Sequence, residues 1–283
     1  MNALTISGLV KEYAGFRLEI PRLELPEGCI MGLIGENGAG KSTTLRLILN
    51  DLSRQSGSIE VLGCDNTSSG FMRVKEELGV VLDESGFPEV LTARQVNAVM
   101  KRTYRSWQQD EYFALLRRFD LPENKPFKDY SRGMRMKQAI AVALAHKPRL
   151  LLLDEATGGL DPIVRDEILG IFSDFAREAD HSVLISSHIV SDLDKLCDTV
   201  ALLHRGRLML TASRDDIGDR FALVRCTRAE FGRIERRAVV GMRDTGYGVE
   251  ALVERALVPA GLTLERPGME DVMLFMAKGE DER

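Results

Sequence analysis

The first 34 residues consist of short apolar runs that are interrupted by residues favouring turns. The interrupting residues are Gly8, Gly15, Pro21, Pro26 and Gly28. This pattern predicts strands in an antiparallel arrangement, followed by the apolar run 29–34 as a further strand. The segment 44–49 has the spacing of an amphipathic helix, so a strand, a glycine-rich loop and a helix follow one another here.

The middle of the chain has helical spacing instead. Between Thr92 and about Phe119, apolar side chains recur every three or four residues, and Pro122 and Pro126 close this segment. Ser131 is a favourable N-cap for the helix that follows it. We therefore predict a group of helices inserted between the strands.

Two later runs, Leu150–Leu153 and Val183–Ile185, are apolar throughout, and a helix of about residues 162–176 is predicted between them. Strands that alternate with helices form a parallel sheet covered on both faces. The chain is therefore predicted to have an α/β fold with a mixed sheet.

After about Asp219 the order of elements starts again. The pattern predicts strands at Phe221–Cys226 and Arg237–Met242, and helices at Val249–Ala256 and Met269–Met276. We expect a main domain of residues 1–218 and a small α+β accessory domain of residues 219–283.

Composition narrows the classes of protein. With 283 residues, 44% of them hydrophobic, the chain can bury a full α/β core. The net charge of -5 argues against a protein that coats nucleic acid, so no nucleic-acid partner is expected. The scattered cysteines (Cys29, Cys64, Cys197 and Cys226) favour free thiols in a reducing compartment over a zinc site. No leader or membrane span is expected, so a membrane role would come through a partner.

The loop between the strand and the helix carries the strongest chemical signal. Its glycines are expected to direct backbone N–H groups at phosphate, with Lys41 reaching the β- and γ-phosphates and the Ser42 hydroxyl binding Mg²⁺. The predicted nucleotide-binding residues are Gly35, Asn37, Gly38, Gly40, Lys41, Ser42 and Thr43. The implied ligand is a nucleoside triphosphate.

A pair of carboxylates, Asp154 and Glu155, follows the strand Leu150–Leu153 at the edge where open α/β sheets bind ligands. Beside a phosphate loop, we expect Asp154 to hold Mg²⁺ and Glu155 to polarise the attacking water as a general base. His188 follows the strand Val183–Ile185 and is expected at the same edge. Taken alone, a histidine at a strand end is more often a core or solvated residue, and Ser131 could be a plain helix cap.

Together these motifs resemble the ATP-binding subunit of an ABC transporter, over about residues 3–215. The matching segments, in the family's order, are Walker A at Gly35–Ser42, the signature at Tyr130–Met134, Walker B at Leu150–Asp154, the catalytic glutamate Glu155, the D-loop at Gly159–Asp161 and the switch histidine His188. The resemblance implies the ABC-ATPase type of P-loop NTPase fold, with a helical subdomain at about residues 87–145.

The resemblance also implies ATP and Mg²⁺ as ligands and ATP hydrolysis as the reaction. The catalytic residues that it implies are Glu155, His188 and Lys41. It adds Ser131, Gly133 and Asp161 as nucleotide contacts, and Tyr13 as the aromatic residue that stacks on adenine. For Tyr13, ordinary packing near a strand end is the alternative.

Two segments depart from the family pattern. Asp83 stands where the family usually has the glutamine of its Q-loop, and it is expected to reach Mg²⁺ while adding negative charge. The signature has Arg132 and Met134 in place of its first glycine and its glutamine. These variants look like those of ATPases that serve ABC-2-type exporters, including exporters of antimicrobial or amphipathic peptides.

By this resemblance, two copies associate head to tail, with each ATP between the phosphate loop of one and Ser131 of the other. A transmembrane permease is the expected partner, which places the chain at the cytoplasmic face of the membrane. We expect Phe87 and Trp107 to form part of the permease-binding groove, whereas core packing is the better explanation for Tyr112 and Phe113.

The predicted function is thus an ATP-hydrolysing subunit that energises an ABC-2-type exporter. A soluble ABC-type ATPase acting on DNA or the ribosome is the alternative, but such proteins resemble two fused cassettes or a cassette split by coiled coils. A nucleotide-binding regulator without turnover leaves Glu155 unexplained. The transported substrate is not encoded in this chain.

Overall fold

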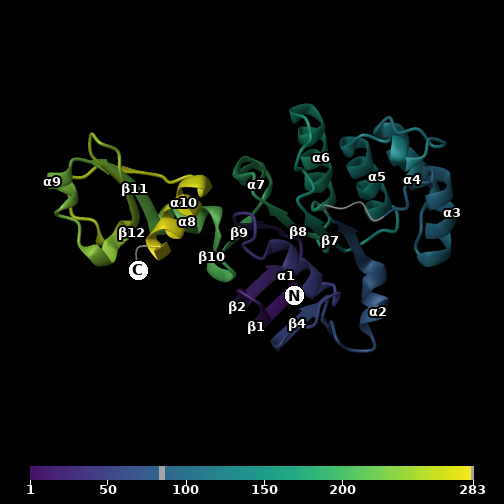
Figure 1. Ribbon diagram of the computed structural model, residues 1–283, viewed down its shortest axis with the longest axis horizontal. Helices are drawn as coiled ribbons and strands as arrows, with labels where there is room; N and C mark the ends of the chain where they lie inside the picture. The colour runs from purple at the N-terminus through teal and green to yellow at the C-terminus, as the bar shows by residue number, and fades with distance from the viewer. Residues whose placement is uncertain (83–86, 282–283) are drawn as a thin grey trace.

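The computed structural model describes residues 1–82 and 87–281 of the chain. Within these residues, ten strands form one mixed sheet in the order β5-β4-β1-β2-β10-β9-β3-β8-β7-β6, and four later strands form a second sheet in the order β12-β13-β11-β14. Helices pack against both sheets, as Figure 1 shows. The mixed-sheet α/β fold predicted from the sequence is therefore confirmed.

The N-terminal part of the large sheet is antiparallel, as predicted. Its strands are β1 (Asn2–Tyr13), β2 (Phe16–Pro26), β4 (Ser56–Val61) and β5 (Cys64–Asp65). β1 lies between β2 and β4 and is antiparallel to both. Apolar side chains such as Leu4, Ile6 and Leu23 are buried, and polar residues alternate with them on the other face.

The centre of the sheet is parallel. Its strands are β3 (Ile30–Ile34), β6 (Leu78–Val81), β7 (Leu150–Asp154), β8 (Ser182–Ser187) and β9 (Thr199–His204). β3 pairs in parallel with β8 and β9, and β7 pairs in parallel with β6 and β8. β10 (Arg207–Ser213) runs antiparallel to β9 and joins the two parts of the sheet through β2. The carboxyl ends of the parallel strands consequently meet at one edge.

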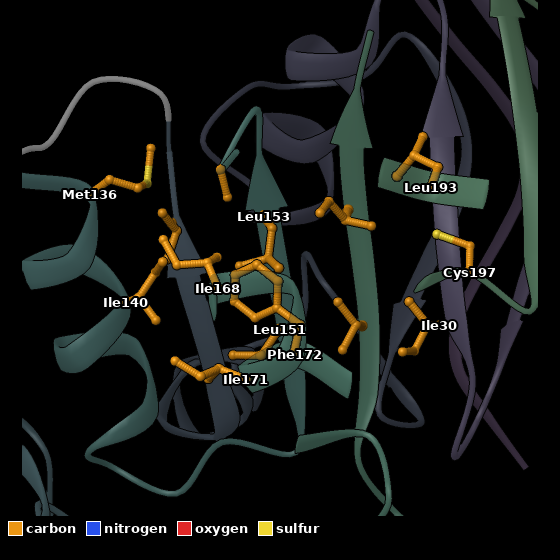
Figure 2. Packing of buried hydrophobic residues seen from close by; sticks show 14 of the residues in the cluster. Ile30, Met136, Ile140, Leu151, Leu153, Ile168, Ile171, Phe172, Leu193 and Cys197 are labelled. Atoms are coloured by element: carbon orange, nitrogen blue, oxygen red, sulfur yellow. The ribbon is translucent and has the colours of Figure 1, made fainter. Parts of the chain in front are cut away.

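Both faces of the parallel strands are covered, which explains their apolar sequences. On β7, Leu151 and Leu153 belong to one buried cluster, whereas Leu150 and Leu152 belong to another on the opposite face. Figure 2 shows the first cluster, in which β7 packs against α5 (Arg132–Leu144) and α6 (Pro162–Phe175). The second cluster includes Leu45 and other residues of α1 (Lys41–Ile48).

The remaining helices of this part are short or lie in the predicted helical segment. They are α2 (Phe71–Val74), α3 (Ala93–Thr103), α4 (Gln109–Arg118) and α7 (Val190–Leu196). The N-cap of α5 is Ser131, as predicted, and that of α3 is Thr92; their hydroxyls accept hydrogen bonds from Met134 N and Gln95 N, respectively. Among the described residues, no helix combines the length and the apolar character needed to cross a lipid bilayer.

The expectation that Trp107 forms part of an exposed groove is wrong. Its side chain is 9% exposed, packs against Tyr112 with 5.2 Å between ring centroids, and donates a hydrogen bond from Nε1 to Asn97 Oδ1 at 2.8 Å. Phe87 is half-buried, with its ring centroid 5.8 Å from that of Phe127. These aromatic residues belong to the core of the helical segment, as expected for Tyr112 and Phe113.

The C-terminal part contains α8 (Arg214–Arg220), β11 (Phe221–Cys226), α9 (Arg228–Phe231), β12 (Val239–Asp244), β13 (Val249–Glu254), β14 (Leu264–Glu265) and α10 (Met269–Asp281). The helix predicted at Val249–Ala256 is wrong: residues 249–254 form β13, the strand between β11 and β12. α10 packs across this sheet and against α7 of the first part. Its residues Met269 and Phe275 belong to the same buried cluster as Leu193.

Candidate active site

The phosphate loop runs from the end of β3 to the start of α1, and two of its glycines have no room for a side chain. A β-carbon on Gly35 would lie 2.4 Å from the carbonyl oxygen of Leu203. A β-carbon on Gly40 would lie 2.9 Å from Leu18 Cδ1, and its φ of +110° is a backbone conformation open mainly to glycine. Glycine is thus required at these two positions, because the backbone of the loop lies so close to β9 and β2.

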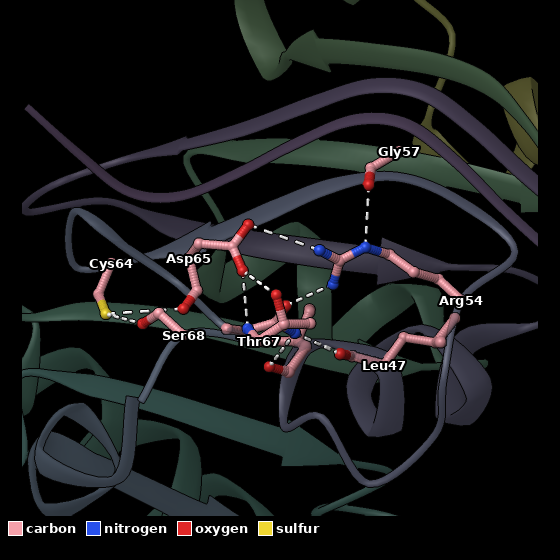
Figure 3. A network of polar contacts seen from close by, with 9 residues as sticks. Leu47, Arg54, Gly57, Cys64, Asp65, Thr67 and Ser68 are labelled. Atoms are coloured by element: carbon pink, nitrogen blue, oxygen red, sulfur yellow. Dashed lines mark hydrogen bonds and ion pairs between the residues drawn. The ribbon is translucent and has the colours of Figure 1, made fainter. Parts of the chain in front are cut away.

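α1 is held at its far end by a network around the β5 hairpin, part of which Figure 3 shows. Asn66 Nδ2 donates hydrogen bonds to the carbonyl oxygens of Leu47 at 2.7 Å and Ile48 at 3.0 Å. Arg54 bonds Asn66 Oδ1 and the Gly57 carbonyl. Carbonyl groups at the end of a helix have no partner within it, so these bonds fix the helix that presents Lys41 and Ser42.

Lys41 lies inside the loop, with its side chain 5% exposed. Its Nζ donates hydrogen bonds to the carbonyl oxygens of Gly35 at 2.8 Å and Glu36 at 3.2 Å. The same nitrogen forms an ion pair with Glu155 Oε1 at 3.2 Å. The ammonium group of Lys41 is therefore fixed between the phosphate loop and the end of β7.

Glu155 occupies a strained position directly after β7. Its φ is +51°, which is uncommon for a residue with a side chain, and its side chain is 15% exposed. Besides Lys41, its partner is His188, whose Nδ1 lies 2.7 Å from Glu155 Oε2. The side chain of His188 is half exposed. The parallel strands β7 and β8 thus bring together two residues that the sequence predicted at one edge.

Ser186 connects these groups, although no sequence pattern predicted a role for it. Its hydroxyl donates a hydrogen bond to Asp154 Oδ1 at 2.6 Å, and its oxygens accept from the Glu155 backbone N–H. The residue lies opposite Asp154 in the ladder of β7 and β8. Its place two residues before His188 was the only signal in the sequence. Ser186 fixes the Asp154 carboxylate and the turn that carries Glu155.

A pocket of about 340 Å³ opens beside this cluster. Its lining residues are Tyr13, Phe16, Asn37, Gly38, Gly40, Lys41, Ser42, Thr43 and Glu155. Apart from Phe16, all of them were predicted as site residues. Tyr13 is 44% exposed at the rim, where Lys11 Nζ lies 5.0 Å from its ring centroid. The pocket therefore offers an aromatic surface, a glycine-rich backbone, a cation and a carboxylate.

Ser131, Gly133 and Asp161 form a separate group. Ser131 caps α5, and Asp161 caps α6 by accepting hydrogen bonds from the backbone N–H groups of Ile163 and Val164. The two loops are neighbours, because a β-carbon on Gly133 would lie 3.6 Å from Leu160 Cδ2. Arg132 lies over the D-loop, with its NH1 2.8 Å from where a β-carbon of Gly159 would be. None of these residues lines the pocket that contains Lys41.

Asp83, the predicted replacement for the Q-loop glutamine, lies outside the described residues. The other predicted metal ligands are Ser42 at the start of α1 and Asp154 at the end of β7, two elements that pack against each other. A hydroxyl and a carboxylate are the hard oxygen ligands that Mg²⁺ takes. Lys41, the loop N–H groups and the hydroxyls of Ser42 and Thr43 are in turn suited to phosphate, so the donor set fits Mg²⁺ and a nucleotide.

Comparison with known proteins places this geometry in context. A family model described as "ABC transporter" matches residues 18–158. The chain is 35% identical over 190 residues to the bacitracin transport ATP-binding protein BcrA of Bacillus licheniformis, covering 66% of this chain and 61% of that protein. It is 33% identical over 216 residues to the lantibiotic transport ATP-binding protein SrtF of Streptococcus pyogenes, covering 75% of this chain and 91% of that protein.

The fold is also similar to that of a solved protein of this kind. A solved ATP-binding subunit of an ABC transporter superposes with a TM-score of 0.68 at 27% identity, over 81% of this chain and 93% of that one. The match to BcrA spans less than two thirds of that protein's length, whereas the match to SrtF spans nearly all of it.

Proposed function

Because this chain belongs to the family of ABC transporter ATP-binding proteins, we propose that it binds and hydrolyses ATP to energise a membrane exporter. The observation that carries the proposal is the partly buried Glu155 carboxylate, held between Lys41 and His188 at the edge of a pocket with a phosphate loop. Around a phosphate loop, a lysine can neutralise phosphate charge, and a carboxylate in contact with a histidine can accept a proton from an attacking water.

In this mechanism the residues of the pocket have separate tasks. The loop N–H groups and Lys41 bind the phosphates and neutralise their charge, and Tyr13 stacks on the adenine ring. Glu155 accepts a proton from the attacking water, and His188, which already contacts Glu155, orients it and hydrogen-bonds the γ-phosphate. Ser42, Asp154 and, at the Q-loop position, Asp83 would hold Mg²⁺, which supplies further charge neutralisation when bound.

Ser131, Gly133 and Asp161 take part only if a second copy is present. They lie at the starts of α5 and α6, away from the pocket lining of their own chain. We therefore propose a head-to-tail homodimer in which the start of α5 of one protomer faces the γ-phosphate bound by the other. The free N–H groups at that helix start suit an anion.

The partner and the location follow from the relatives. Two of them are ATP-binding proteins for the transport of bacitracin and of a lantibiotic, so the cargo proposed here is an antimicrobial or amphipathic peptide. We propose a permease of the ABC-2 type as the membrane partner, which would hold this chain at the cytoplasmic face. A soluble ATPase acting on DNA or the ribosome is not favoured by these relatives.

We also propose the division into an ATPase domain of residues 1–218, with a helical subdomain at about 87–145, and an accessory domain of residues 219–283. Its support is that α8 ends at Arg220 and that the following strands belong to the second sheet.

The composite site can be tested by mixing two variants that are each inactive. Glu155→Gln removes the base but leaves the phosphate loop, and Ser131→Asp keeps a good N-cap on α5 while placing a negative charge against the γ-phosphate. In a mixed dimer, one site carries both changes and the other carries neither. We expect ATP hydrolysis to recover on mixing and to depend on the ratio of the two variants.

An activity of the mixture equal to the sum of its two components would contradict the head-to-tail site. The matched control is a mixture of Glu155→Gln with wild-type protein, in which every dimer that contains the variant keeps at most one complete site. Sedimentation of Glu155→Gln with saturating ATP provides the second readout, because the proposal predicts a stable dimer there.

A further inference from the structure

A second pocket lies in the C-terminal part, far from the phosphate loop and independent of it. Its volume is about 360 Å³. The lining residues are Phe231, Gly232, Ile234, Arg236, Arg237, Val239, Val240, Gly241, Met242 and Gly279. In Figure 1 these segments belong to the end of the molecule opposite α3, where β12, α9 and the C-terminus lie.

The pocket runs along the edge of a sheet. β12 is the outermost strand in the order β12-β13-β11-β14, and within the described residues it pairs only with β13. Neighbouring residues of a strand point to opposite faces, so a pocket lined by four consecutive residues, Val239 to Met242, is approached from the edge and not from one face. Alternate backbone N–H and C=O groups of an antiparallel edge strand point outward.

On one side of this edge, α10 packs closely against β12. A β-carbon on Gly241 would lie 1.9 Å from the carbonyl oxygen of Phe275, and one on Gly279 would lie 1.9 Å from that of Val240. The backbone of α10 therefore packs directly on that of β12. The other side is formed by the apolar side chains of Ile234, which belongs to the small buried cluster of this sheet, and of Phe231 and Met242, which are partly buried against it.

The rim of the pocket is basic. The segment 228–237 contains four arginines and two glutamates, in a chain whose net charge is -5. Arg236 and Arg237 are exposed at the rim, and Arg237 Nε contacts Glu235 at 2.6 Å. Arg236 makes no ion pair within the described part of the chain. The pocket thus combines outward backbone groups, apolar contacts and excess positive charge.

We propose that this edge is a docking site for an extended acidic peptide segment of a partner protein, which adds to β12 as a further strand. The backbone of β12 supplies directional hydrogen bonds, while the apolar side accepts alternate side chains of the segment. Arg236 and Arg237 select carboxylates on the segment and speed its association. No ATP-dependent step is involved, so the site does not rest on the proposed ATPase function.

The test uses the full chain and a fluorescent peptide of alternating glutamate and valine, with binding followed by anisotropy. We expect saturable binding, loss of binding when lysine replaces glutamate in the peptide, and at least about tenfold weaker binding by the double variant Arg236→Glu, Arg237→Glu. The matched control is Arg102→Glu, an exposed position on α3, which should bind as wild type does.

Two peptides with N-methyl groups on alternate residues separate strand addition from simple charge attraction. In an added strand, every second N–H group points toward β12, and the others point away from it. Methylation of the N–H groups that point toward β12 should therefore abolish binding, whereas methylation of the others should not. Equal binding of both methylated peptides would overturn strand addition, and so would unchanged binding by the double arginine variant or saturable binding of the lysine peptide.

Discussion

Two glutamates in this molecule each contact two basic side chains, but their surroundings differ. Glu155, at the end of β7, contacts Lys41 at 3.2 Å and His188 at 2.7 Å, and it lines the pocket of the phosphate loop. Glu250, the second residue of β13, accepts hydrogen bonds from Arg225 Nε at 2.7 Å and from Arg243 Nε at 2.5 Å. Each carboxylate therefore has two basic side chains in contact with it.

The difference lies in the backbone and in the origin of the partners. The partners of Glu250 stand directly opposite it on the neighbouring strands β11 and β12, in regular pairing. Glu155 stands at a φ of +51°, and its partner Lys41 is the first residue of α1, a helix and not a paired strand. A carboxylate paired by its ladder neighbours stabilises a sheet, whereas one held at a strained turn toward a pocket is arranged for chemistry.

Replacement of Lys41, a partner of Glu155, should have the largest effect. Lys41→Ala is expected to abolish measurable ATP hydrolysis and most ATP binding, because it removes the cation that faces the phosphates. Isothermal titration with ATP and circular dichroism on the same sample would check this. An unchanged dissociation constant for ATP would show that the phosphate loop is not the nucleotide site.

Glu250→Gln should show the opposite pattern. Burial opposes ionisation of Glu250, but hydrogen bonds from Arg243 and Arg225 outweigh it, so the pKa lies below its ordinary value. The charged form is thus favoured in the folded state, and its loss should lower the free energy of unfolding by about 2 kcal/mol at neutral pH. Urea denaturation would measure this, with Glu254→Gln on the same strand as the control.

The lowered pKa of Glu250 also predicts how its contribution to stability changes with pH. A carboxyl group with a depressed folded-state pKa contributes stability above its unfolded pKa, and that contribution is lost as the pH falls through the folded pKa. The stability difference between wild type and Glu250→Gln should therefore shrink in acid. Any fall in ATP hydrolysis by this variant while it remains folded would break the contrast with Glu155.

Tyr13→Ala tests the aromatic edge of the pocket. If the ring stacks on adenine, ATP affinity should fall by about 1 to 2 kcal/mol, and Tyr13→Phe should retain it. Affinity for inorganic triphosphate is the internal control, because it has no base to stack. Equal losses for ATP and triphosphate would assign Tyr13 to packing instead.

A third buried ionisable side chain should give the smallest effect. Burial lowers the pKa of His146, although its ring nitrogens lie near the carbonyl oxygens of Leu78 at 3.0 Å and Val142 at 3.2 Å. The unfolded chain therefore binds a proton more readily, and stability should fall as the pH drops below about 6.5. His146→Gln should reduce the slope of the unfolding free energy against pH by at most about 1.4 kcal/mol per pH unit. Identical slopes for wild type and variant would contradict this role of His146.

The sequence predicted best where a function depends on adjacent residues. The strand, glycine-rich loop and helix around Lys41 lie within twenty consecutive residues, and the four consecutive leucines of β7 predicted a buried strand. The positions of Glu155 and His188 at one edge follow from the parallel order of the strands.

What could not be predicted depends on partners distant in sequence. β13 was predicted as a helix because it is buried on both faces and lacks the alternation of a strand. The burial of Glu250 needed arginines from two other strands, which no local pattern indicates. Trp107 is internal because Asn97, on the preceding helix, accepts its N–H. Ser186 acts through Asp154, which is 32 residues away.

The most direct test of the contrast between the two glutamates is the rate of ATP hydrolysis by Glu155→Gln in a single turnover, measured beside Glu250→Gln. The proposed general base predicts that Glu155→Gln binds ATP yet hydrolyses it at least about a hundredfold more slowly, while Glu250→Gln hydrolyses it at the wild-type rate. A Glu155→Gln rate within a few-fold of wild type would contradict the assignment of Glu155 as the base.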